Sequence, residues 1–143
     1  MSLAPHQDPA VVELGRVELT ALRESASSLL TASLLTDDGF EVVRVADPTT
    51  EAADGARFAS MASSIQALSE AVARELTMGS GEYVIIAAER GHLIQMRIPG
   101  STIVLAALFG TDEMLGKALT VSRRTATRIA DGLLQHTRTT VAL

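Results

Sequence analysis

The chain has 143 residues, of which 47% are hydrophobic, and its formal net charge at pH 7 is −5. This length predicts a single domain, and the absence of cysteine excludes a disulfide scaffold, a thiolate metal site and a cysteine nucleophile. The negative charge and the small aromatic content, three phenylalanines and one tyrosine, argue against nucleic-acid binding, which needs basic groups and stacking surfaces.

The N-terminal part predicts a short disordered segment followed by a helix. We expect residues 1–7 to be disordered and residues 8–143 to form the single domain. Asp8 and Pro9 are typical of a helix N-cap followed by proline at the first helical position. A helix should therefore run from this point to about Glu24.

A β-hairpin is predicted next. Two short apolar runs, residues 29–36 and 40–45, flank the sequence Asp37-Asp38-Gly39. An Asp-Gly pair between two strand-like runs indicates a hairpin, because the two central residues of the tight turn need positive φ angles that glycine and aspartate tolerate.

A long helix is predicted over Ala52–Thr77, and it carries two different stripes. The large apolar residues form one stripe: Phe58, Met61, Ile65, Leu68, Val72 and Leu76. The small residues form the other: Ser60, Ser63, Ser64, Ala67 and Ala71. We expect the large stripe to pack on the chain's own sheet and the small stripe to contact a partner; packing of the small stripe on the sheet is the alternative.

Three strands and a final helix complete the predicted order. The strands are Glu82–Glu89, His92–Ile98 and Thr102–Phe109, and the helix is Asp112–Gln135, capped by Thr111. Since the first and third of these strands are apolar on both faces, the sheet needs cover on both sides. The sequence predicts an α/β (α+β) fold, an α/β/α sandwich with the order α-β-β-α-β-β-β-α. Its five-stranded antiparallel sheet would have helix two on one face and helices one and three on the other.

Residues that could carry chemistry are better explained by local structure. Gly79-Ser80-Gly81 ends a helix, whereas a phosphate loop precedes one. Asp37 and Asp38 belong to a turn and point apart into solvent. Several further polar residues lack a partner at a catalytic spacing and suit strand ends or helix surfaces: His92, His136, Arg123, Arg124 and Arg128. We therefore predict no catalytic residue, metal or cofactor.

No segment has the character of a membrane span or a signal peptide. The longest uncharged stretch, Ile98–Thr111, contains Pro99 and is shorter than the about 18 apolar residues that a membrane helix needs. The N-terminus lacks a basic segment followed by an apolar run. We expect a cytoplasmic protein without a membrane partner.

The first strand after the long helix is predicted to be an exposed sheet edge. Hairpin connections give the spatial strand order 2-1-5-4-3, which places Glu82–Glu89 at the rim. An apolar edge strand invites aggregation unless another strand pairs with it. Antiparallel pairing with a second copy about a two-fold axis would satisfy it. The expected dimer-interface residues lie along this strand: Tyr83, Val84, Ile85, Ile86 and Ala87.

With these elements assigned, the sequence resembles the Roadblock/dynein light chain domain family over about Ala32 to Leu134. The resemblance rests on the hairpin Ala32–Gly39, the Ala/Ser-rich helix with Met61 and Leu68, the turn Arg90-Gly91 and Leu115-Gly116 in the last helix. It implies the α/β/α fold, a homodimer with a continuous ten-stranded sheet, and regulation of a small Ras-like GTPase without a catalytic apparatus. The N-terminal part, longer and proline-containing, departs from the family pattern.

The resemblance also implies where a partner binds. Family members typically use the paired second helices of the dimer, which here correspond to the small stripe and its charged neighbours: Arg57, Ser60, Ser63, Ser64, Ala67, Glu70, Ala71 and Arg74. The leading hypothesis is a homodimeric GTPase regulator. The alternatives are a scaffold or light-chain-like adaptor that docks a protein or peptide without nucleotide dependence and, less favoured, a small-ligand sensor.

Overall fold

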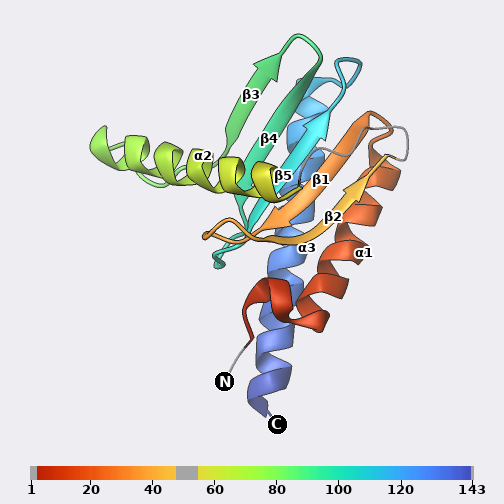
Figure 1. Cartoon of the computed structure of the whole chain (residues 1–143), viewed down its shortest axis with the longest axis vertical. Helices are drawn as coiled ribbons and strands as arrows, with labels where there is room; N and C mark the ends of the chain where they lie inside the picture. Colours follow the sequence, from red (N-terminus) through yellow and green to blue (C-terminus); the bar gives the residue numbers. More distant parts are fainter. Residues whose placement is uncertain (1–2, 48–54, 143) are drawn as a thin grey trace.

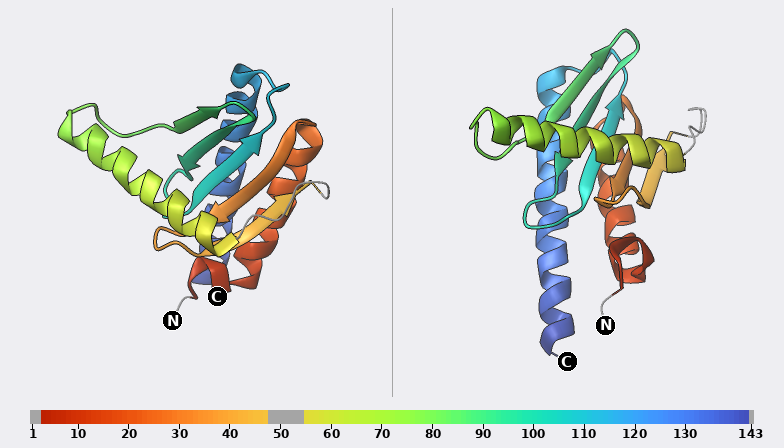
Figure 2. Two further views of the ribbon diagram at one scale, coloured as in Figure 1. Left: turned by 45° about the horizontal axis from the view of Figure 1, so that its top comes forward. Right: turned by 60° about the vertical axis from the view of Figure 1, so that its left-hand side comes forward.

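The computed structural model describes residues 3–47 and 55–142. A single five-stranded antiparallel sheet, in the order β2-β1-β5-β4-β3, is crossed by α2 on one face and covered by α1 and α3 on the other (Figures 1 and 2). The elements in chain order are η1 (Pro5–Gln7), α1 (Pro9–Ser25), β1 (Leu29–Leu35), β2 (Glu41–Ala46), α2 (Gly55–Glu75), β3 (Val84–Ala88), β4 (Gly91–Arg97), β5 (Val104–Phe109) and α3 (Leu115–Ala142). The predicted fold class and element order are confirmed.

The start of α1 is capped as the sequence predicts. Asp8 Oδ1 accepts a hydrogen bond from the Ala10 backbone N–H at 3.0 Å, which satisfies one of the unpaired donors at the helix start. The other carboxylate oxygen lies 3.1 Å from His136 Nε2 on α3, so η1 and the C-terminal turns of α3 share one end of the molecule (Figure 1).

The segment expected to be disordered contains a turn of 3-10 helix at Pro5–Gln7, while residues 1–2 lie outside the described residues. The ring of His6 stacks on Phe40 with 4.5 Å between centroids. This contact joins the N-terminal segment to the hairpin.

The predicted β1–β2 hairpin is present, and Asp37-Asp38-Gly39 forms its turn as the sequence predicts. Thr36 and Phe40 pair through their backbones, and the intervening loop has three residues, of which Gly39 takes a φ of 90°. The Thr36 hydroxyl donates to Asp38 Oδ1 and accepts from the Phe40 N–H, and it lowers the pKa of Asp38. Since Asp37 and Asp38 do not have positive φ, one glycine suffices here.

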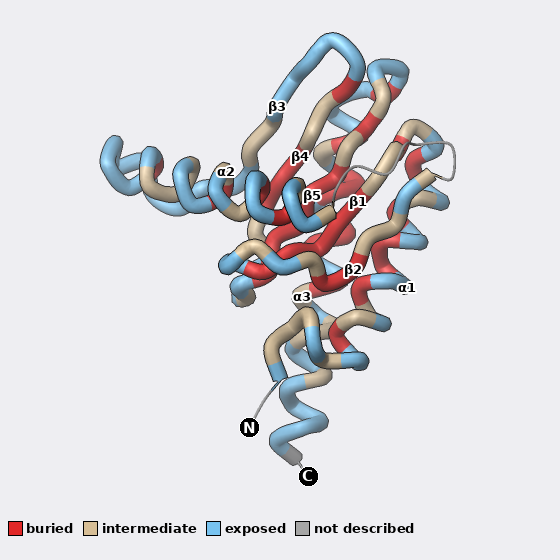
Figure 3. Tube along the Cα trace, in the orientation of Figure 1, coloured by how far each residue is buried: buried red, intermediate tan, exposed pale blue. Residues whose placement is uncertain are grey.

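The two faces of the sheet have cores of unequal size, and α2 is mostly exposed or intermediate along its length (Figure 3). The larger core, which includes Leu19, Leu22, Ile94 and Phe109, lies between the sheet and the helices α1 and α3. The smaller core lies under α2 and consists of four buried residues, Leu35, Ala59, Ala62 and Ala106. Apolar burial therefore holds α1 and α3 far more strongly than α2.

The end of α2 differs from the prediction. The helix ends at Glu75 instead of at the predicted Thr77, because Thr77 adopts a left-handed φ of 54° and reverses the chain. The Met78 N–H donates to the Ala73 carbonyl at 2.8 Å and closes the last turn. The predicted start at residue 52 lies outside the described residues.

The bounds of α3 also differ. It begins at Leu115, because a turn that joins the Glu113 N–H to the Gly110 carbonyl comes between Thr111 and the helix. It continues to residue 142 instead of ending at Gln135, since no glycine or proline follows Gly132 to interrupt it. Within the described residues, no helix combines the length and apolar content that crossing a bilayer would require.

Candidate interaction surface

β3 is an edge strand, and its outer edge pairs with no other described strand. β3 pairs with β4 alone among the described strands. The residues expected at a dimer interface lie here: Val84, Ile85, Ile86 and Ala87 are in β3, and Tyr83 directly precedes it. Ile86 and Tyr83 are each about 40% exposed, which is unusual for large apolar side chains in a small domain. Arg123 of α3 flanks this edge, because its guanidinium covers the Tyr83 ring and pairs with Glu82.

Most of the large apolar stripe of α2 does not pack on the sheet, so that prediction is wrong except at Phe58, which packs against the smaller core. Met61, Leu68 and Val72 are 54%, 67% and 47% exposed. The side that faces the sheet carries smaller or polar residues instead: Ala59, Ala62, Gln66 and Ala73. Neither predicted stripe is the buried face, because the helix is turned so that the two stripes flank the contact with the sheet.

The residues of the sheet under α2 explain how the helix is oriented. Gln95 stands in the middle of β4 and is fully buried. Its amide Nε2 donates to the Ala62 carbonyl at 2.8 Å and to Gln66 Oε1 at 3.1 Å. A side chain can reach a backbone carbonyl within a helix only where small residues let the helix approach closely. The polar sheet residue therefore selects the alanine face of α2.

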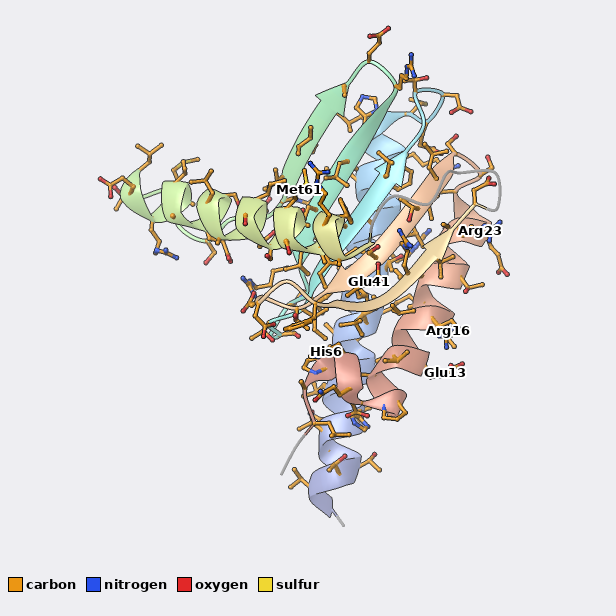
Figure 4. The ribbon with its side chains drawn as sticks, viewed as in Figure 1. His6, Glu13, Arg16, Arg23, Glu41 and Met61 are labelled. Atoms are coloured by element: carbon orange, nitrogen blue, oxygen red, sulfur yellow. The ribbon has the colours of Figure 1, made fainter. Side chains whose placement is uncertain are left out.

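The large stripe lies beside β3. Val72 and Gln66 line one hollow of about 370 Å³ together with Tyr83 and Val84. Figure 4 shows Met61 on the side of α2 turned toward β3 and β4. The exposed apolar stripe of α2 thus meets the start of β3 at Val72.

The small stripe lies on the opposite flank of α2, next to the hairpin turn. Ser60, Ser64 and Ala67 are exposed, whereas Ser63 and Ala71 are half-buried. A Cβ placed on Gly39 would lie 3.4 Å from Ser63 Oγ, so the turn and the helix are in close contact. The charged residues expected beside this stripe divide into two kinds. Arg57 and Arg74 are exposed, whereas Glu70 is half-buried.

Glu70 belongs to an ion-pair network that the sequence reasoning missed. Arg97 at the end of β4 donates to both carboxylate oxygens of Glu70, at 3.0 and 2.6 Å, and to Asp37 Oδ1 of the hairpin turn at 2.7 Å. Hydrogen bonding from Arg97 lowers the pKa of Glu70, and Glu70 raises the pKa of Arg97. The available signal was the alternation of Gln95 and Arg97 on one face of an otherwise apolar strand.

The hollows in this region do not assemble a reactive site. The one with a volume of about 850 Å³ is lined by Glu70, Arg74, Thr77 and Arg97, among others, and Glu70 and Arg97 already bind each other. Within residues 3–47 and 55–142, no group of His, Cys, Asp or Glu side chains is arranged to hold a metal ion. The features that stand out are the exposed apolar side chains of α2 and the open edge of β3.

The model of the Roadblock/LC7 domain matches residues 17–109 of the chain. No curated protein matches the sequence significantly.

Several solved structures share the fold. Gliding protein MglB from Thermus thermophilus superposes with a TM-score of 0.76 at 18% sequence identity, covering 92% of this chain and 93% of that one. MglB from Myxococcus xanthus has a TM-score of 0.77 at 15% identity over 86% and 96% of the two chains. A Roadblock/LC7 domain from Streptomyces avermitilis has a TM-score of 0.64 at 19% identity over 87% and 94%.

Proposed function

The chain belongs to the Roadblock/LC7 domain family, and from that premise we propose that it is a non-enzymatic homodimer that binds a small Ras-like GTPase and modulates its activity. We propose further that it is a cytoplasmic bacterial protein; the similar MglB proteins come from Thermus thermophilus and Myxococcus xanthus. The observation that carries the proposal is the exposed apolar stripe of α2 beside the open edge of β3.

The first step of the proposal is self-association through this surface. Two β3 edges that pair antiparallel about a two-fold axis would satisfy the backbone groups that each leaves open and extend the sheet across both copies. The same axis brings the two α2 helices side by side in opposite directions. Because Met61 and Val72 lie on the β3 side of α2, the two large stripes would then face each other and lose their exposure to water.

The second step concerns the partner. In such a dimer the small stripe of each α2 stays on the outer flank, next to the hairpin turn. Its short side chains, Ser60, Ser64 and Ala67, allow another protein to approach closely, and Arg57 and Arg74 offer charged contacts at the two ends. A regulator of this kind acts by favouring one conformation of the GTPase, so its affinity must differ between nucleotide states.

Two measurements test the proposal. Light scattering should give a mass of about 30 kDa, twice the 15.0 kDa of one chain, at micromolar concentration. Purified Ras-like GTPases of the source organism, loaded with GDP or with a non-hydrolysable GTP analogue, should bind with affinities that differ by about tenfold or more, which corresponds to about 1.4 kcal/mol. A monomeric protein at every concentration would rule out the dimer.

The alternative function is an adaptor that docks a protein without regard to nucleotide. The open β3 edge favours it, because an extended peptide can add a strand there as well as a second copy can. Equal affinity for the two nucleotide states, with unchanged rates of hydrolysis and exchange, would favour the adaptor over the regulator.

A further inference from the structure

The contact of α2 with the sheet changes in character along the helix. Near its start, Ala59 and Ala62 join a small apolar core with Leu35 and Ala106. Beyond Ala62, the sheet side carries Gln66, Glu70 and Ala73, and large apolar residues such as Leu68 are exposed. Hydrophobic burial therefore contributes little to holding the C-terminal half of α2 in place.

Polar groups of β4 hold that half instead. Gln95 binds the Ala62 carbonyl and Gln66 Oε1, and Arg97, two residues further along the same strand face, binds both oxygens of Glu70. Ala62, Gln66 and Glu70 are spaced four residues apart, so successive turns of α2 are anchored by alternate residues of β4. The bidentate pair fixes direction as well as distance, because a guanidinium and a carboxylate meet in one plane.

Arg97 also reaches a third segment. Its Nη1 donates to Asp37 of the β1–β2 turn at 2.7 Å, and that turn lies against Ser60 and Ser63 of α2 at Gly39. One side chain on β4 thus joins the far half of α2 to the turn that borders its near half. These two segments frame the small stripe.

We propose that Arg97 is a positioning residue that locks the C-terminal half of α2 and the β1–β2 turn into one arrangement, and thereby sets the affinity of the α2 surfaces for their partners. The locking is a property of the isolated chain. Its effect on affinity rests on the function proposed above.

Amide hydrogen exchange tests the locking directly. In Arg97→Gln, the amides of the C-terminal half of α2 should exchange about tenfold faster, because a helix released from its support is marginally stable. The amides of β1 and β5, in the larger core, should keep their protection. Glu70→Gln breaks the same pair from the helix side and should give the same pattern. Arg16→Gln, which removes an exposed pair with Glu13 on α1, is the control.

A conservative variant separates positioning from bulk electrostatics. Arg97→Lys keeps the charge but cannot form the two-pronged contact, so it should restore only part of the protection. Unchanged exchange in α2 of Arg97→Gln would overturn the proposal. Equal acceleration in α2, β1 and β5 would also overturn it, because Arg97 would then support the whole fold.

Measurements of self-association and of partner binding use the same variants. Self-association of Arg97→Gln should weaken by about tenfold relative to Arg16→Gln, with Arg97→Lys in between. Failure of every GTPase to bind the wild-type protein would refute the proposed function but leave the exchange result standing. Faster exchange in α2 with unaltered self-association and partner affinity would refute the claim that the lock sets affinity.

Discussion

A single buried amide decides which face of a helix turns inward. Gln95 is fully buried on the α2 side of the sheet, and its Nε2 bonds a helix carbonyl. Its Oε1 has no hydrogen-bond partner among the described residues, so loss of the two bonds of Nε2 would leave the whole amide unsatisfied, at a cost of a few kcal/mol. Leaving an aliphatic side chain of α2 in water forfeits a comparable gain that a partner can later recover. In the single chain, the hydrogen bonds of Gln95 therefore determine the orientation of α2. The large apolar side chains of α2 stay exposed and can contact a partner.

The pKa of Glu70 makes the contact with Arg97 sensitive to acid. Arg97 chiefly, with Gln66 and Arg74, lowers this pKa below its ordinary value of 4.5. A carboxylate whose pKa is lower in the folded chain stabilises the fold above pH 4.5, and this contribution is lost as the pH falls through the folded-state pKa. Glu70→Gln should cost about 1 kcal/mol of unfolding free energy at neutral pH.

Urea denaturation of both proteins between neutral pH and pH 3 checks this expectation. The difference in unfolding free energy between wild type and Glu70→Gln should shrink as the pH drops below 4.5. A difference that stays constant across the range would contradict the role assigned to the Glu70 carboxylate.

At the scale of elements, α1 approaches the sheet through a glycine. A Cβ on Gly15 would lie 2.7 Å from Leu34 Cδ1 and from Val43 Cγ1, and both of those side chains are buried. The close approach lets α1 lie directly on β1 and β2. It also leaves no space for an added methyl group, because neighbours on both sides are packed in the larger core.

Gly15→Ala should therefore lower the free energy of unfolding by about 1–3 kcal/mol. Gly116→Ala on α3 is the matched control, since a Cβ there meets nothing within 4 Å. The control should raise the stability by about 0.5–1 kcal/mol through helix propensity alone. Urea denaturation of the two variants gives both values, and equal effects would show that the approach of α1 is not tight.

At the scale of the whole molecule, the two faces of the sheet have different roles. The side of α1 and α3 holds the larger core and supplies stability, whereas the side of α2 exposes apolar surface beside an open edge. Surfaces for self-association and for a partner would then occupy the two flanks of one helix. A substitution on one flank should therefore affect self-association without affecting partner binding, and a substitution on the other flank should do the reverse.

Val72→Glu and Ala67→Glu add the same charge to opposite flanks of α2. Val72→Glu should weaken self-association by about a hundredfold or more, because it would bury an unpaired carboxylate between the two stripes. Ala67→Glu should leave the dimer intact and weaken binding of the partner. Light scattering and partner titration of both variants measure this, and loss of the dimer in Ala67→Glu would contradict the assignment of the flanks.

Much of the fold could be predicted because its signals are local. The Asp-Gly hairpin, the proline at the start of α1 and the helical repeat over α2 each act within a few residues. The orientation of α2 could not be predicted, because a repeat identifies a stripe but not its neighbour. The deciding contacts join residues far apart in sequence, namely Gln95 with Ala62, Glu70 with Arg97, and Asp37 with Arg97. The late start of α3 depends likewise on a turn that its own helical pattern does not reveal.

The contact of Asp8 Oδ2 with His136 Nε2 brings the N-terminal segment and the end of α3 together, away from the outer edge of β3 (Figure 1). Attachment to a biosensor chip through either segment would accordingly leave the open strand and both flanks of α2 pointing into the flow cell. A fluorophore carried at the same place would report on complex formation without obstructing it.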